Sequence, residues 1–269
     1  MGVRESQVFP LLGQTKYVGS VTHPLFPSMG IDFLVGALGA DVKTGTGVPY
    51  THTISPTNTL PSYTLEKNIG NYESLQFAGC RVNKWGLKTQ ATDSEAEVTV
   101  DWIAKTAAVF TSPTAVTVVN ESPFVFAEGV VSLFGGAIGT ATNIDINVEN
   151  VLKDTYTIAA SHDLTFLTPT ERHVSGTLDV VFESLDDTTV GYEKKLMAGT
   201  QGALSLTLTH PTNSYSVQLY LDSVQFSKYA DDIKLGDVVI SSLSFEANYS
   251  LTTSETIKAI VMNGISTGY

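Results

Sequence analysis

Strict alternation of hydrophobic and polar residues is the feature of this sequence that most constrains its fold. From Ala96 to Trp102 every even position is hydrophobic, and from Glu95 to Asp101 every odd position is polar or charged. Residues two apart share one face of a β-strand, so this segment predicts a half-buried strand. The same period recurs at Leu178–Phe182, Leu204–Leu208, Val217–Leu221 and Leu243–Tyr249. Because antiparallel sheets often have one solvent-exposed and one buried face, we predict a mainly β protein.

A helical period is found in two short segments. Ser28 to Leu38 offers Ser28 as an N-cap, hydrophobic residues at helical spacing and Gly39 as a stop. Thr189 to Gly199 offers a second short helix that Gly199 would end. We therefore predict one short helix in each half of the chain.

Two segments interrupt the alternation. Within Leu75 to Leu87 the hydrophobic parity changes at Ala78-Gly79, which predicts a β-bulge in a long bent strand. The Gly/Thr/Pro-rich segment from Ala40 to Leu60 has two interpretations: an extended hairpin arm or a disordered surface loop.

The two halves of the chain show the same series of patterns. Val18-Gly19-Ser20-Val21 precedes the first helical segment as Ser175-Gly176-Thr177-Leu178 precedes the second. Further along, the segments 81–83 and 98–104 match 223–225 and 242–247. A diverged internal duplication explains these matches, and the alternative is that two unrelated β-meanders with a helix look alike. With a boundary in Thr111–Pro123, the duplication predicts two antiparallel β-sandwich or barrel domains, residues 1–120 and 121–269.

Charge and cysteine content exclude several classes of protein. Lys and Arg number 15 against 27 Asp and Glu, a net charge of −12, so nonspecific binding to nucleic-acid phosphates is disfavoured. Cys80 is the single cysteine, so an intramolecular disulfide scaffold is excluded. No apolar run approaches the roughly 20 residues of a membrane-spanning helix, and the first residues lack a signal-peptide core. We expect a protein made in a cytoplasm and not inserted in a membrane.

Motifs for catalysis or metal binding are weak. The five histidines include no paired-ligand spacing. Asn143, Asp145, Asn147 and Glu149 resemble the start of a calcium loop, but Val148 stands where its glycine is required, so a strand is predicted. Gly264 to Gly268 matches a nucleophile elbow, yet only Tyr269 follows it and the required helix has no room. We therefore predict no enzyme, no cofactor and no metal.

Five blocks of strand-and-turn sequence carry a resemblance to a known family: Tyr63–Gly70, Phe77–Trp85, Val98–Lys105, Ile144–Leu152 and Val174–Leu178. They resemble the major tail tube proteins of long-tailed bacteriophages. The resemblance implies a tube domain with one flanking helix, whose inner sheets join between subunits into a closed barrel. Rings of such subunits stack into a tail through which DNA passes. Because one tube domain needs about half of this chain, the duplication predicts three chains per ring with approximate sixfold symmetry.

The resemblance also implies partners and a location. The protein would be a structural component of the virion tail, assembled in the host cytoplasm, with tail terminator and tail tip proteins as partners. DNA would cross the lumen without specific binding, which an acidic wall favours. The candidate lumenal residues are the polar sides of the closing strands: Glu95, Glu97, Asp101, Ser242, Ser244, Glu246 and Asn248. Alternation leaves open whether this face meets the lumen or the outer solvent.

Two other classes of protein remain open. One is a β-sandwich module for carbohydrate binding or adhesion, in which Trp85 and Trp102 would form a sugar-stacking platform. The other is a different virion component, such as a capsid decoration or baseplate protein. Both tryptophans lie in alternating segments, which favours a place in the core.

Overall fold

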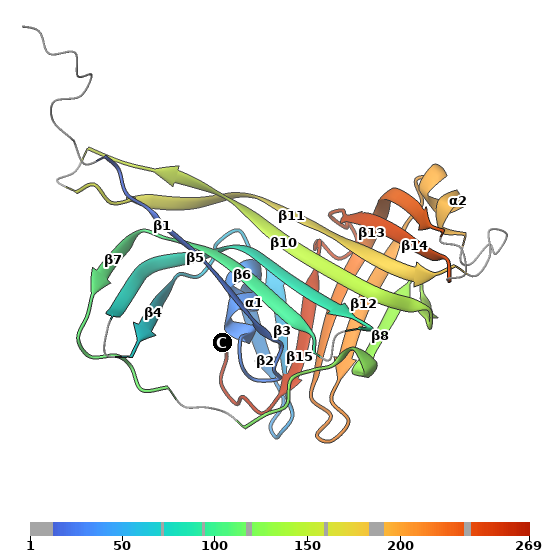
Figure 1. Cartoon of the computed structure of the whole chain (residues 1–269), viewed down its shortest axis with the longest axis horizontal. Coiled ribbons are helices and arrows are strands. Elements are labelled where there is room, and N and C mark those ends of the chain that lie inside the picture. Colours follow the sequence, from blue (N-terminus) through green and yellow to red (C-terminus); the bar gives the residue numbers. More distant parts are fainter. Residues whose placement is uncertain are drawn as a thin grey trace, which may run out of the picture.

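The computed structural model describes residues 13–70, 73–92, 95–116, 120–158, 161–182, 191–233 and 238–269. Strands dominate, and the named strands pair antiparallel, which confirms the mainly β prediction (Figure 1). The first half contains β1 (Tyr17–Pro24), α1 (Ile31–Leu38), β2 (Gly39–Thr44), β3 (Tyr50–Pro56), β4 (Tyr63–Ile69), β5 (Glu73–Gln90), β6 (Glu97–Ala104) and β7 (Thr106–Val109). The second half contains the 3-10 helix η1 (Phe126–Glu128), β8 (Gly129–Leu133), β9 (Gly136–Ile138), β10 (Ala141–Thr155), β11 (Phe166–Val181), α2 (Tyr192–Met197), β12 (Gln201–Thr209), β13 (Ser216–Asp232), β14 (Ile240–Ala247) and β15 (Lys258–Asn263).

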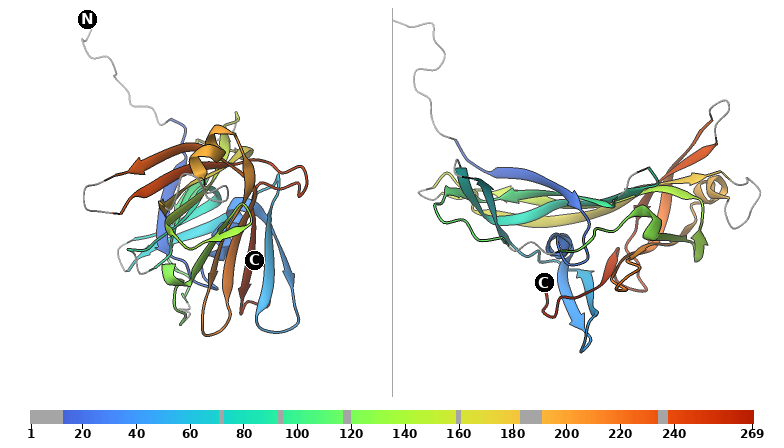
Figure 2. Two further views of the ribbon diagram at one scale, coloured as in Figure 1. Left: turned by 90° about the vertical axis from the view of Figure 1, so that its right-hand side faces the viewer. Right: turned by 60° about the horizontal axis from the view of Figure 1, so that its bottom comes forward.

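One open sheet runs through both halves. Its strand order is β1-β6-β5-β10-β11-β14-β13-β12-β8-β9. The N-terminal part of each long strand pairs with two further strands. β4 and β7 pair with this part of β5, and β12 and β15 pair with this part of β13. β15 also pairs with β3 and so connects the β2–β3 hairpin to the second half. The hairpin projects from the body of the molecule (Figure 2), which confirms the extended arm as the interpretation of the Ala40–Leu60 segment.

The core lies on the side of this sheet that carries the alternating hydrophobic residues. Its largest fully buried side chains include Trp85, Phe124 and Phe245. Trp102 is 8% exposed and packs on Phe77 with a centroid distance of 5.0 Å. Both tryptophans therefore belong to the core, as predicted, and neither offers an exposed sugar platform.

The two halves have the same strand order. β1-β6-β5-β4 in the first half corresponds to β11-β14-β13-β12 in the second, and α1 and α2 each follow the first strand of their series. Gly19 lies opposite Trp102, and Gly176 lies opposite Phe245. A Cβ at either glycine would overlap the aromatic ring facing it, so each glycine allows that ring to pack across the strand.

The long strands also carry irregularities at matching places. β5 has an extra residue at Ala78-Gly79 against β4, and β13 has one at Asp222-Ser223 against β12. The first of these is the predicted bulge, and Gly79 has φ 66°. A second register shift follows Val82 against β6, and its equivalent follows Phe226 against β14. Aligned by these contacts, Val82 corresponds to Phe226, not to Val224 as the sequence pattern had suggested.

Both helices are shorter than predicted. α1 begins at Ile31, and the residue before it is Gly30, so the prediction of Ser28 as N-cap is wrong. The Ser28 hydroxyl instead donates to Glu121 Oε1 at 2.8 Å, and its backbone N–H donates to Oε2 at 3.1 Å. Gly39 ends α1 at φ 125°, as predicted. α2 begins at Tyr192, and the first two residues of the predicted helix, 189 and 190, lie outside the described residues.

Candidate functional site: the polar face of the sheet

The side of the sheet opposite the core carries polar residues in rows that cross both halves. Strand register defines these rows, because residues paired across neighbouring strands lie side by side on one face. One row is Glu97, Lys88, Asp145, Thr177, Ser244 and Lys228. A second is Thr22, Thr99, Gly86, Asn147, Ser175 and Glu246. Two shorter rows are Ser20, Asp101, Lys84 and Glu149, and Asn143, Asp179, Ser242 and Ala230.

Five of the seven candidate residues predicted from sequence lie in these rows: Glu97, Asp101, Ser242, Ser244 and Glu246. The register brings Glu97 of the first half and Ser244 of the second into one row. Glu95 and Asn248 fall outside the strands, Glu95 before β6 and Asn248 after β14. Sequence reasoning did not include the polar residues of β5, β10 and β11 in the candidate site, although alternation in Asn143–Glu149 had already predicted a strand there.

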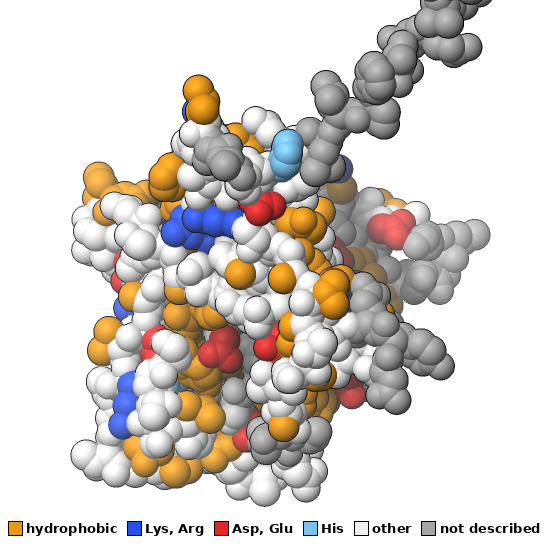
Figure 3. Space-filling model, turned by 90° about the vertical axis from the view of Figure 1, so that its left-hand side faces the viewer, with side chains coloured by type: hydrophobic (Ala, Val, Ile, Leu, Met, Phe, Trp, Pro, Cys, Tyr) orange, Lys and Arg blue, Asp and Glu red, His pale blue; other side chains and the backbone are white. Residues whose placement is uncertain are grey.

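Charges on this face are interleaved. Lys84 lies between Asp101 and Glu149, and Lys88 lies between Glu97 and Asp145. Carboxylates outnumber lysines in the four rows. At the end of the molecule shown in Figure 3, Lys and Arg side chains also lie in small groups beside acidic and uncharged ones. A surface of this kind is suited to contact with a polyanion without holding it.

Hydrogen bonds fix several of these side chains. Asp179 accepts from Asn143 Nδ2 at 3.0 Å and from Ser242 Oγ at 2.5 Å, which joins β10, β11 and β14. Asn147 Nδ2 donates to Asp145 Oδ1 at 2.5 Å within β10. The polar face therefore has an ordered hydrogen-bond pattern in its centre.

Burial raises the pKa of Asp145 above its usual range. The hydrogen bond from Asn147 and the charges of Lys84 and Lys88 act in the opposite direction and offset part of this increase. In the folded chain Asp145 therefore holds its proton to a higher pH than it does in the unfolded chain. Its contribution to stability is greatest at acidic pH and decreases as pH rises through the folded pKa.

Replacing Asp145 by Asn should therefore change the pH dependence of stability. We expect Asp145→Asn to gain in free energy of unfolding relative to the unmodified chain as pH rises from about 4 to 7, because the variant has no carboxyl group to ionise. Asn147→Ala should have the opposite effect and make the loss with rising pH steeper. Urea unfolding at the two pH values measures both trends, and parallel curves for all three proteins would contradict the assignment.

The described residues offer little for catalysis. No group of three or more His, Cys, Asp or Glu side chains that could hold a metal ion occurs among them. A pocket of about 270 Å³ beneath η1 and the β8–β9 hairpin is lined by residues such as Ile144, Val131 and Leu206, with no charged side chain in its lining. Of the helices that the structure describes, none is long and apolar enough to cross a membrane.

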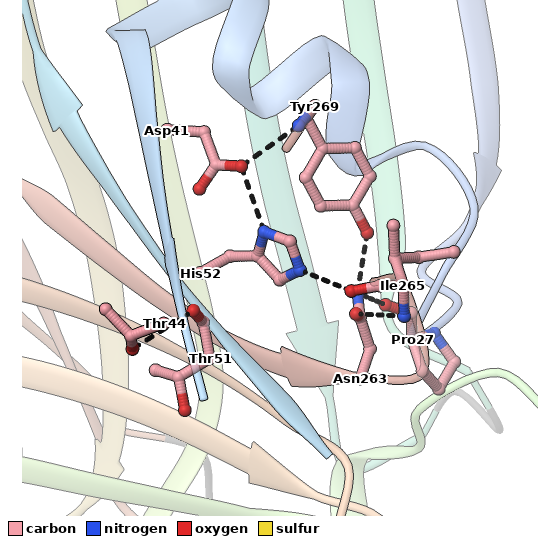
Figure 4. A network of polar contacts seen from close by, with 8 residues as sticks. All are labelled: Pro27, Asp41, Thr44, Thr51, His52, Asn263, Ile265 and Tyr269. Atoms are coloured by element: carbon pink, nitrogen blue, oxygen red, sulfur yellow. Dashed lines mark hydrogen bonds and ion pairs between the residues drawn. The ribbon is translucent and has the colours of Figure 1, made fainter. Parts of the chain in front are cut away.

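A second polar cluster joins the C-terminal segment to the β2–β3 hairpin (Figure 4). His52 Nδ1 lies 2.9 Å from Asp41 Oδ2, and its Nε2 lies 3.1 Å from the Ile265 carbonyl oxygen. The Tyr269 backbone N–H donates to the same Asp41 oxygen at 3.0 Å, and its ring lies 4.8 Å from the His52 ring. Asn263 Nδ2 donates to the Tyr269 hydroxyl at 2.6 Å. Burial raises the pKa of Tyr269, so its hydroxyl stays protonated.

One family model matches most of the chain. It is described as phage tail tube protein, and the match covers residues 6–247. No curated protein matches the sequence. The matched range includes β1 to β14 and therefore the whole polar face.

Proposed function

Because the chain belongs to the phage tail tube protein family, we propose that it assembles into rings, and that these stack into the tube that conducts phage DNA to the host. The chain is a structural component of the virion tail. A structural family suggests a non-enzymatic role, and we extend this to the absence of any hydrolase or transferase activity. Tail terminator and tail tip proteins are the partners we propose for the two ends of the tube.

We further propose that the chain holds two tube domains, residues 1–120 and 121–269, so that three chains form a ring with approximate sixfold symmetry. Two matched features support this division. The strand order β1-β6-β5-β4 repeats as β11-β14-β13-β12. The paired irregularities of β5 recur in β13, and unrelated meanders would have no reason to share them.

The polar face is the lumenal wall in this proposal, and its continuity across both halves is the observation that carries the function. Rows such as Glu97 to Lys228 extend over six strands without crossing the core. A surface with more carboxylates than lysines would let DNA pass, because sustained binding to phosphates requires clustered Lys and Arg. Glu95, Glu97, Asp101, Ser242, Ser244, Glu246 and Asn248 keep their proposed place on or beside this wall.

Electron microscopy of the purified protein tests the proposal. We expect rings or tubes, and native mass measurement of isolated rings should give three chains. Six chains per ring would refute the duplication while leaving the tube assignment in place. A monomer that binds glycans and never assembles would favour the adhesion module, although the burial of Trp85 and Trp102 argues against an aromatic platform.

A further inference from the structure

A polar pocket of about 200 Å³ lies between β11 and the segment that follows β3. Both halves of the chain contribute to its lining. Thr57 and Asn58 come from the first half, and Asn150 and Pro169–Arg172 come from the second. Among the residues that line it, Arg172 carries the single positive charge. The pocket therefore brings a guanidinium group to the junction of the two halves.

The Arg172 side chain is surrounded by neutral hydrogen-bond acceptors. Its Nε donates to Asn150 Oδ1, and its Nη2 donates to Leu38 O and Thr57 O, at distances between 2.9 and 3.2 Å. Carbonyl oxygens at the end of a helix carry only part of a negative charge. Among the described residues, no carboxylate forms an ion pair with Arg172. Burial lowers the pKa of Arg172, and no charged group acts in the opposite direction, so its charge has no counterion within the described chain.

Two N–H groups of Arg172 are still available for a ligand. A guanidinium has five N–H donors, and its three hydrogen bonds use one on Nε and two on Nη2. Nη1 has no acceptor among the described residues, yet it is not one of the buried atoms that lack a partner. Nη1 is therefore accessible to solvent, and the pocket is the accessible space that Arg172 lines.

Glu171 also lines the pocket, but it does not neutralise Arg172. Consecutive residues of a strand point to opposite faces. Arg172 is paired with Asn150 and shares its face. The Glu171 carboxylate instead lies 3.3 Å from Nε2 of His173, two residues further along β11, and the Glu171 side chain is 70% exposed. Glu171 therefore contacts a residue on the opposite face of β11 and leaves Nη1 without a partner.

We propose that this pocket binds a small oxyanion through Arg172 Nη1, with the amide of Asn58 as a second donor. Oxyanions form strong charge-assisted hydrogen bonds with arginine, whose charge persists even when the side chain is partly buried. The net charge of −12 disfavours anions on most of the surface, so binding requires a local cation such as this one. Because its lining comes from both halves, a bound oxyanion would also connect residues 57–58 to β11. The proposal does not depend on tube assembly.

Thermal unfolding of the unassembled full chain tests this site. Inorganic phosphate is added at constant ionic strength, with chloride as the anion that it replaces. A ligand that binds only the folded chain raises the unfolding temperature, so we expect a rise of about 3–6 °C when phosphate exceeds its dissociation constant by about tenfold. Acetate in place of phosphate distinguishes a carboxylate from a phosphate group as the preferred occupant. An unfolding temperature that responds to neither anion would overturn the proposal.

The variant Asn58→Asp tests whether the response belongs to this pocket, because it places a carboxylate in the same lining as Arg172. We expect this variant to unfold at a higher temperature than the unmodified chain without phosphate, and to lose the rise with phosphate. Asn213→Asp is the matched control, since Asn213 lies in the exposed turn between β12 and β13 and undergoes the same change of charge. It should keep the whole rise. Equal responses of the two variants to phosphate would contradict the assignment.

Side-chain NMR identifies the arginine that binds. The chain has three arginines, Arg4, Arg81 and Arg172, so its Nε–H signals are few. The variant Arg172→Lys assigns the Arg172 signal by its loss. We expect this signal to shift as phosphate is added and to reach saturation together with the unfolding temperature, while the other two signals stay in place. An unchanged Arg172 signal, or equal shifts of all three signals, would overturn the proposal.

Discussion

Replacing His52 by leucine is expected to lower the free energy of unfolding by about 3–5 kcal/mol, because the buried Asp41 side chain then keeps only the hydrogen bond from the Tyr269 backbone N–H. The side chains of His52 and Asp41 are 0% and 1% exposed. Within the described residues, Asp41 Oδ1 has no hydrogen-bond partner, so Asp41 depends on its other oxygen, which contacts His52 and Tyr269. The same substitution removes the contact between His52 Nε2 and the Ile265 carbonyl oxygen, so the C-terminal segment should detach from the β2–β3 hairpin.

Chemical denaturation of the unassembled chain measures this loss in free energy of unfolding. His173→Leu is the matched control, because His173 pairs with Glu171 at 3.3 Å but the two side chains are 61% and 70% exposed, and such a pair contributes little. The double variant Asp41→Leu/His52→Leu should lose less free energy of unfolding than the two single variants lose in sum. The reason is that neither polar side chain then stays buried without the other. Similar losses for His52→Leu and His173→Leu would refute the interpretation of the cluster as a buried clamp.

Replacing Asn150 by alanine should lower the free energy of unfolding by about 2–4 kcal/mol, because two buried carbonyl oxygens lose their donor. Asn150 on β10 is 1% exposed, and its Nδ2 donates to Ala37 O at 3.0 Å and to Val82 O at 3.3 Å. Ala37 belongs to the last turn of α1, where carbonyls have no partner within the helix. Asn150 therefore connects the second half of the chain to the helix of the first.

Arg172 adds hydrogen bonds to the same connection between the two halves. It would lose one of them in Asn150→Ala. Its Nε donates to Asn150 Oδ1 at 3.2 Å, and its Nη2 donates to Leu38 O at 3.0 Å and to Thr57 O at 2.9 Å. Asn143→Ala is the matched control on the same strand, since Asn143 lies on the polar face and donates to Asp179. Thermal or urea unfolding should show a loss of at most about 1 kcal/mol for the control. Equal losses for the two variants would contradict a special role for Asn150.

Alternation predicted β6, β12, β14 and parts of β5, β10, β11 and β13 together with their buried faces, because a period of two specifies both at once. Alternation does not predict contacts between residues that are far apart in the sequence. Ser28 has the residue type and position of an N-cap, yet its hydroxyl contacts Glu121, far away in the sequence. The rows of the polar face depend on strand order and register, so the placement of Lys88 between Glu97 and Asp145 has no local signal.

The buried cluster around His52 and Asp41 also depends on contacts that the local sequence does not predict. Asp41 and His52 lie close in sequence, but their burial depends on Ile265 and Tyr269 from the other end of the chain. The proposed duplication rests on a repeated sequence pattern, and the alignment of the two halves required the strand register. The matched irregularities of β5 and β13 pair Val82 with Phe226, two residues away from the match that the sequence pattern suggested. Sequence periodicity gives the faces of strands, whereas neighbours across a sheet are decided by the whole fold.

The β2–β3 hairpin has no counterpart in the second half, where only Ala198 to Thr200 separate α2 from β12. A ring of three such chains would repeat its sheet six times around the axis and its hairpin three times. Seen from the lumen, a rotation of 60° would leave the wall nearly unchanged, whereas the projecting hairpins would coincide with their starting positions only after 120°. A ring added to another would then have three equivalent orientations in place of six, and the order of the rotational symmetry of the whole tube would be set by its hairpins.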